Sequence, residues 1–192
     1  MIASFEHDLT ESCEEAADFL RKKLFEWRNE RSIKNEVYSG EREFVSEVYR
    51  LLIEKNGCYR EALFVDYFPY PRGNEQGENI VRLSNDEKKN ERSLPDLVFT
   101  DRPNNINVVE FDVIVNRGRK GNFRLRKDDI KKLRNDFIKL NKYNNRFKSK
   151  FLVVAYTGDL EYKDGTKFPL DLFKEKVHRE FGKSDKTKVI VC

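Results

Sequence analysis

The sequence predicts an α/β protein in which helices pack against a mixed sheet. Three features predict this class: two amphipathic helical segments begin the chain, short segments rich in aromatic and β-branched residues follow, and helices alternate with apolar strands in the second half. Elements in this order bury their apolar faces best in layers. The 192 residues, 38% of them hydrophobic, suffice for one packed core, so we expect a single domain over residues 1–192.

Two helices are expected near the N-terminus. Residues 10–31 carry apolar side chains at helical spacing, and the acidic start and basic end of this segment suit the helix dipole. Residues 41–55 follow Gly40 and precede Gly57, which is a natural helix stop. The apolar face of this second helix consists of Phe44, Val45, Val48, Leu51 and Leu52.

The pattern then becomes typical of strands. Residues 61–70 are rich in aromatic and β-branched residues and end at prolines, as strands often do. Residues 72–93 are polar and predict a long loop, to which the short IVRL segment could add a strand. Residues 94–101 and 107–115 are typical of two neighbouring strands joined by a turn.

The second half predicts a helix, a strand, a helix and a strand. Residues 127–143 repeat apolar side chains at helical spacing, and FLVVAYTG at 151–158 is a continuous apolar run, as expected of a strand covered on both faces. Pro169 opens a helix that extends to Phe181, and residues 187–192 form the final predicted strand.

Several classes of protein lack support in the sequence. No apolar run is long enough to cross a membrane, and the acidic N-terminus differs from a basic targeting segment, so we expect a cytoplasmic location. Cys13, Cys58 and Cys192 are too widely spaced for a disulfide framework or a zinc site. His7 and His178 lack the Ser or Cys arrangement of a catalytic triad, and no glycine-rich phosphate loop is present.

Charge is distributed unevenly, although the net charge is only +4. Residues 117–150 contain 14 Lys and Arg against three Asp, a local net of +11, whereas residues 1–20 hold six acids and no Lys or Arg. A basic block of this size suits a polyanion such as nucleic acid, because phosphate contacts release counterions. The alternative is a solvated helix face without a partner. Candidate nucleic-acid contacts are Arg117, Arg119, Lys120, Arg124 and Lys131.

Two acids interrupt the apolar stretch VVEFDVIV. Glu110 and Asp112 would point to the same face of a strand, roughly 6 to 7 Å apart, and repel by about 2.5 kcal/mol at an effective dielectric constant near 20. Asp96 begins the neighbouring strand, and carboxylate oxygens are preferred ligands of Mg²⁺. A further acid can come from the second helix, where Glu41 falls on the core face and Glu47 is the alternative.

This order of features resembles the PD-(D/E)xK nuclease superfamily, which has the restriction-endonuclease-like fold. GEREFVSEV is similar to the first helix of archaeal Holliday-junction resolvases, LPDLVF to the PD element, and VVEFD to the strand that carries (D/E)xK. The resemblance covers residues 40–158 and implies an αβββαβ core with a mixed sheet flanked by helices. Residues 1–35 would be an N-terminal helical extension, and residues 159–192 a C-terminal helix and strand.

The resemblance also implies functional roles. A site for Mg²⁺ or Mn²⁺ would take Asp96, Glu110 and the backbone carbonyl of Phe111, with Glu41 acting directly or through water. The implied activity is hydrolysis of phosphodiester bonds, with DNA favoured over RNA as the substrate. Many enzymes of this fold cut both strands as homodimers, and the acidic N-terminal helix offers one surface for a protein partner.

Asp112 departs from the motif, which usually has a lysine there to orient the attacking water and to offset charge on the phosphate. Three accounts stay open: the cation comes from the following helix, as Arg126 or Lys127; Asp112 is an extra metal ligand; or the site is inactive and the fold is kept for binding. The catalytic candidates are therefore Asp96, Glu110, Asp112, Arg126 and Lys127. The leading hypothesis is a Mg²⁺-dependent nuclease, and the alternative is an inactive nuclease-like module that binds nucleic acid or a protein.

Overall fold

The computed structural model describes residues 4–31, 40–57, 59, 63–65, 95–100, 106–114, 125–142, 147–158, 160–161, 165–184 and 186–192. The helices in these residues are α1 (Phe5–Arg31), α2 (Glu41–Lys55), α5 (Lys127–Lys142) and α6 (Leu170–Phe181). The strands are β1 (Leu63–Val65), β2 (Leu97–Thr100), β3 (Ile106–Ile114), β4 (Phe147–Tyr156) and β5 (Lys188–Val191). None of the described helices has both the length and the apolar character needed to cross a lipid bilayer.

The five strands form one mixed sheet in the order β1-β2-β3-β4-β5. β1, β2 and β3 are antiparallel neighbours, whereas β3, β4 and β5 run parallel to one another. The pairing of β2 with β3 stops at Leu97 and Val109, but β3 continues beside β4 as far as Ile114. In the described part of the chain, the second half of β3 therefore extends past the start of β2.

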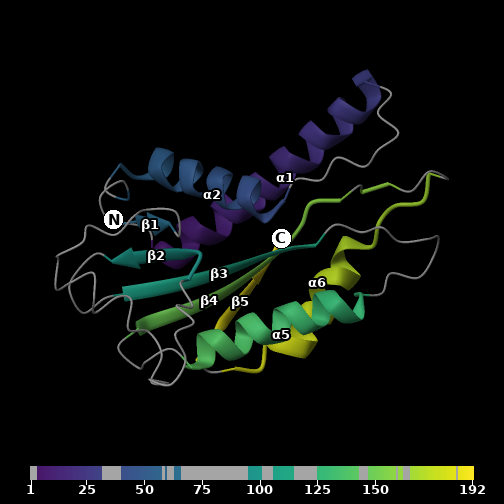
Figure 1. Cartoon of the computed structure of the whole chain (residues 1–192). Coiled ribbons are helices and arrows are strands. Elements are labelled where there is room, and N and C mark those ends of the chain that lie inside the picture. Colours follow the sequence, from purple (N-terminus) through teal and green to yellow (C-terminus); the bar gives the residue numbers. More distant parts are fainter. Residues whose placement is uncertain are drawn as a thin grey trace.

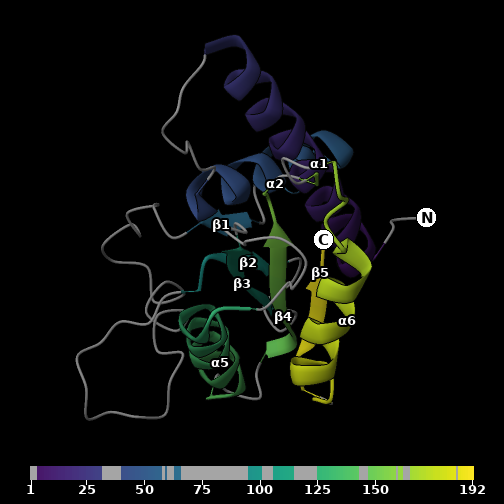
Figure 2. The same cartoon turned by 90° about the vertical axis from the view of Figure 1, so that its right-hand side faces the viewer.

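Helices cover both faces of the sheet (Figures 1 and 2). α1 and α2 pack on one face, where their apolar side chains meet Val109 and Phe111 of β3. α5 and α6 pack on the other face, against Val108 and Ile114. Because side chains alternate along a strand, β3 contributes to both cores. The predicted mixed α/β class is confirmed, and residues 151–158 are buried, as their continuous apolar run predicts.

Element boundaries differ from the sequence predictions mainly in the first helix and the first strand. α1 begins at Phe5 rather than at residue 10, and the Phe5 ring stacks on Phe99 of β2 with a centroid distance of 4.3 Å. Of the strand predicted over residues 61–70, the structure describes β1 alone. The IVRL segment lies outside the described residues. The strands predicted at 94–101 and 107–115 pair antiparallel, as expected, in the form of β2 and β3.

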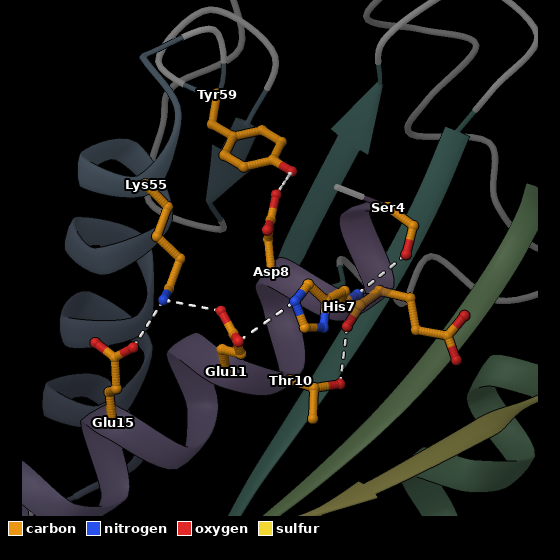
Figure 3. A network of polar contacts seen from close by, with 9 residues as sticks. Ser4, His7, Asp8, Thr10, Glu11, Glu15, Lys55 and Tyr59 are labelled. Carbon is orange, nitrogen blue, oxygen red and sulfur yellow. Dashed lines mark hydrogen bonds and ion pairs between the residues drawn. The ribbon is translucent and has the colours of Figure 1, made fainter. Parts of the chain in front are cut away.

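Polar contacts attach α1 to the rest of the fold. Figure 3 shows Lys55 of α2 between two acids of α1, with its Nζ 3.2 Å from Glu11 and 2.7 Å from Glu15. The Tyr59 hydroxyl donates a hydrogen bond to the buried Asp8 carboxylate at 2.5 Å. Further ion pairs with lysines of β5 and α6 are Glu6–Lys188 and Glu14–Lys174. Acidic side chains of α1 thus form ion pairs with lysines of the same chain.

Candidate functional site

The Asp96 side chain joins the start of β2 to the middle of β3. Leu97, the first residue of β2, pairs with Val109 of β3. Asp96 comes one residue earlier and therefore lies opposite Glu110. Its Oδ2 atom accepts a hydrogen bond from the backbone N–H of Phe111 at 2.7 Å. The carboxylate therefore satisfies a backbone donor of β3 at the point where the pairing with β2 has ended.

Glu110 is buried in β3 and faces α5. The residue is only 2% exposed. The Nζ atom of Lys139 lies 2.8 Å from each of the two carboxylate oxygens. A buried carboxylate is costly unless it is paired, and Lys139 supplies the compensating charge from α5.

Asp112, which is also 2% exposed, contacts a second lysine of α5. Lys132 forms an ion pair with Oδ1 of Asp112 and also binds Oε2 of Glu41. Glu41 is the first residue of α2, and the first turn of this helix is fixed to β3 by an edge-to-face contact between Phe44 and Phe111, with a centroid distance of 5.8 Å. Lys132 thus links α2, β3 and α5.

We name Glu41, Asp96, Glu110 and Asp112 the four-acid site. α5 runs past it antiparallel to β3: Lys132 meets Asp112, and Lys139, two turns later, meets Glu110. The antiparallel direction explains why the later lysine binds the earlier acid.

A charged stripe of α5 faces the site, and sequence reasoning missed it. Lys132, Asp136 and Lys139 are spaced at i, i+4 and i+7, so they lie along one side of the helix. The stripe adjoins Leu133 and Leu140, which are buried in the core between α5 and the sheet. This adjacency to the apolar stripe was visible in the sequence and could have identified all three residues.

Burial shifts the protonation of both Asp96 and Asp112. For Asp96, burial raises the pKa to about 6, although the Phe111 N–H favours the ionised form. For Asp112, burial raises the pKa to about 8 despite the Lys132 ammonium, and the Asp136 carboxyl adds to the rise. Burial lowers the pKa of Lys132, but its two carboxylate partners outweigh this effect and raise the pKa well above its usual value. The lysine therefore stays charged while Asp112 holds a proton readily.

The site carries an excess of negative charge. The Oδ2 atom of Asp112 is buried and has no hydrogen-bond partner among the described residues, and the carboxyl groups of Asp112 and Asp136 can share a hydrogen bond only when one of the two is protonated. When every group is ionised, the described residues of the site present five carboxylates and two ammonium groups, which is a surplus of three negative charges. The carboxylates are Glu41, Asp96, Glu110, Asp112 and Asp136, and the ammonium groups are Lys132 and Lys139.

The structure joins Glu41 to Asp112 through Lys132, while Glu110 pairs with Lys139 and Asp96 binds the backbone between Glu110 and Asp112. Glu41, however, is not a core residue: its side chain is 38% exposed at the start of α2, where the helix end leaves room for solvent. Glu47, the alternative acid, pairs with Arg50 of its own helix at 2.6 Å, and hydrogen bonding to Arg50 lowers its pKa. Phe111, whose carbonyl is a predicted ligand, lies in β3 next to Asp96.

The predicted basic residues have different positions. Arg126 and Lys127 are exposed at the start of α5. The lysines that contact the acids in the described residues are instead Lys132 and Lys139, because α5 passes the two acids further along its length. Lys131, a predicted nucleic-acid contact, is exposed on α5. The remaining predicted contacts, Arg117, Arg119, Lys120 and Arg124, lie outside the described residues.

The donors of the site suit a hard divalent cation in chemistry and in charge. Carboxylate oxygens are the ligands that Mg²⁺ prefers, and a cation is favoured by the surplus negative charge of the described residues and by the Asp112 oxygen that has no partner among them. Across the described ranges, no group of three or more His, Cys, Asp and Glu side chains is arranged to hold a metal ion. Ammonium groups occupy the positions nearest to Glu110 and Asp112. The residues therefore fit Mg²⁺ or Mn²⁺ by the chemistry of their donor atoms. In the structure, lysine ammonium groups pair with two of these carboxylates.

No protein-family model, curated protein or solved structure matches this chain. What the site does is therefore inferred from its own chemistry.

Proposed function

We propose that this protein is a metal-dependent nuclease with a restriction-endonuclease-like core, which hydrolyses phosphodiester bonds of DNA. The observation that carries the proposal is the linkage of carboxylates from α2, from the start of β2 and from β3 at one place beside two lysines of α5. Buried carboxylates cost folding free energy, so a protein without a use for them would gain stability by replacing them with apolar residues. A site for a cation and a phosphate gives them a use.

In this proposal, Asp96 and Glu110 hold Mg²⁺ or Mn²⁺ together with the backbone carbonyl of Phe111, and Glu41 acts directly or through water. When bound, the metal lowers the pKa of a water molecule and neutralises charge on the phosphate. The hydrogen bond from the Phe111 N–H fixes Oδ2 of Asp96 and leaves Oδ1 for a ligand. Because the pKa of Asp96 is raised to about 6, its carboxyl group is ionised, and so able to bind a metal, above about pH 6.

Lys132 supplies the cation that the motif lysine provides in other members of the superfamily. Its ammonium contacts Asp112, the residue at the motif position. Asp112 therefore binds a lysine at the position where the motif has one. The Lys132 side chain is 51% exposed, which lets its ammonium meet a phosphate that arrives from solvent. These contacts support the account in which the cation comes from the following helix, at Lys132 in place of Arg126 or Lys127.

Exposed basic residues on α5 support a nucleic-acid substrate. Lys127 and Lys131 are exposed one turn apart on the same helix that supplies Lys132. Such lysines bind backbone phosphates and position a duplex without reading its sequence. The same helix would then contribute to both substrate binding and catalysis.

The test is a cleavage assay with purified protein and supercoiled plasmid or single-stranded DNA in Mg²⁺, in Mn²⁺ and in a chelator. We expect cleavage that requires the metal and is lost in the double variant Asp96→Ala, Glu110→Ala. Asp128→Ala, which removes an exposed acid of α5, serves as the matched control and should cleave normally. Cleavage that survives the double substitution would reject the proposal.

The second candidate is an inactive nuclease-like module that binds nucleic acid. It is favoured by one observation: Glu110 and Asp112 are already neutralised by lysines, so the acids do not need a metal to be stable. This candidate predicts salt-sensitive DNA binding that Mg²⁺ does not change. Calorimetric titration with Mg²⁺ and Mn²⁺ separates the two, since only the nuclease binds metal at millimolar concentration.

A further inference from the structure

The Lys139 ammonium lies directly in front of the Glu110 carboxylate. Its Nζ atom is 2.8 Å from both Oε1 and Oε2, so it bonds to both oxygens at once. Mg²⁺ binds such oxygens at about 2.0 to 2.1 Å. A divalent ion at this carboxylate would therefore lie next to the ammonium, and two cations at such a short distance repel strongly in a partly buried site.

Lys139 can leave this position without unfolding the protein. Its side chain is 23% exposed, whereas the side chain of Glu110 is 3% exposed, so the ammonium has a path to solvent that the carboxylate lacks. Its four-carbon stem is flexible. The backbone of α5 is held by Leu133 and Leu140 in the core, independently of the lysine.

We propose that Lys139 is a built-in counter-cation of the metal site, whose ammonium neutralises Glu110 until a divalent metal displaces it. This inference rests on the proposed nuclease function. Without metal, the Lys139 ammonium keeps the fold stable by neutralising Glu110. Because it competes directly with the metal, it also lowers the affinity of the site for metal. When the metal enters, the displaced ammonium becomes a free positive charge on α5. Lys132 differs from Lys139 because its ammonium contacts Asp112 and Glu41 rather than Glu110, where the metal would displace Lys139.

The test is calorimetric titration of Mn²⁺ into the full chain and into Lys139→Met, which removes the charge and keeps most of the volume. We expect Lys139→Met to bind Mn²⁺ about ten-fold more tightly or better, because a competing like charge is gone. Arg134→Met is the matched control: it removes a charge from the exposed side of α5, where Arg134 pairs with Glu180, and should bind like the wild type.

The possible results separate this inference from the function on which it rests. Equal or weaker binding by Lys139→Met, with measurable binding by the wild type, overturns the role of Lys139 and leaves the nuclease proposal standing. Absence of Mn²⁺ binding in all three proteins overturns both.

A measurement on the wild-type chain covers the case in which Lys139→Met does not fold. Nitrogen-15 NMR of lysine ammonium groups should show a protected Lys139 signal, identified by its loss in Lys139→Arg, and saturating Mg²⁺ should abolish it. A signal that persists while Mg²⁺ is bound overturns the proposal.

Discussion

The Lys132 ammonium of α5 lies against the carboxylate of Asp112, a buried acid of β3. In the proposed nuclease, Asp112 stands at the position where the PD-(D/E)xK motif has lysine, and this contact brings a positive charge from α5 to that position.

Lys132→Met should lower the rate of DNA cleavage by about 100-fold or more, because a preorganised cation near the phosphate contributes this much to transition-state stabilisation. In assays above about pH 8, where Asp112 is ionised, Asp112→Asn should also lower this rate, since the lysine then keeps only Glu41 as an anionic partner. The double variant should be no slower than Lys132→Met alone, as expected for residues that act as a unit. Arg134→Met removes a charge from the exposed side of α5 and should keep the wild-type rate; a normal rate in Lys132→Met would contradict the role.

Asp96→Asn should stabilise the protein above pH 6. The pKa of Asp96 is raised from 3.8 to about 6, so the native state binds this proton more tightly than the unfolded chain. The resulting stability is complete below about pH 4, is lost as pH rises to about 6, and amounts to about 3 kcal/mol at most. Asn still accepts the hydrogen bond of Phe111 but has no charge to bury. Urea unfolding at pH 4 and pH 8 should show a gain at pH 8 alone; equal gains would reject this explanation.

The Glu110–Lys139 pair should respond asymmetrically to the loss of either partner. Lys139→Met leaves a carboxylate that is 2% exposed without this lysine and should cost about 3 kcal/mol of unfolding free energy. Glu110→Gln leaves an ammonium that can turn to solvent, so we expect about 1 kcal/mol. Glu180→Gln breaks the exposed pair with Arg134 and should cost less than about 1 kcal/mol. Denaturant unfolding of the three variants gives the ranking, and the reverse order for the first two would show that Glu110 does not depend on Lys139.

Tyr59→Phe should weaken the attachment of α1. The variant removes the hydroxyl that donates to the buried Asp8 carboxylate at 2.5 Å and should cost about 2 kcal/mol, as for hydrogen bonds to charged groups. Tyr49→Phe is the control, since Tyr49 packs at the edge of the same core. Thermal unfolding should show a lower midpoint for Tyr59→Phe only, and equal midpoints would mean that Asp8 is satisfied in another way.

Lys131→Gln should weaken DNA binding equally for all sequences. Loss of one phosphate contact lowers the dependence of log K on log salt by about 1. Fluorescence anisotropy at several salt concentrations measures this slope in the presence of a chelator, which separates binding from cleavage. Lys183→Gln, which lies just after α6, is the control, and an unchanged slope for Lys131→Gln would remove α5 from the binding surface.

Local periodicity determined most of the fold and part of the site. Helical spacing predicted α2, α5 and α6, and the continuous apolar run predicted a strand, β4, that is buried on both faces. Alternation along β3 predicted that Glu110 and Asp112 share a face, and both face α5. These features depend only on neighbours in the sequence, so one chain suffices to infer them.

Only the tertiary structure decided which cations meet those acids. The candidates drawn from the sequence were Arg126 and Lys127, but the contacts belong to Lys132 and Lys139. The choice depends on how far α5 slides and rotates along β3, and this is set when Leu133 and Leu140 pack into a core built from distant strands. A difference of one helical turn moves a side chain by about 5.4 Å, which is more than an ion pair tolerates. The sequence therefore determined where the charges lie along each element, and packing between elements determined which of them meet.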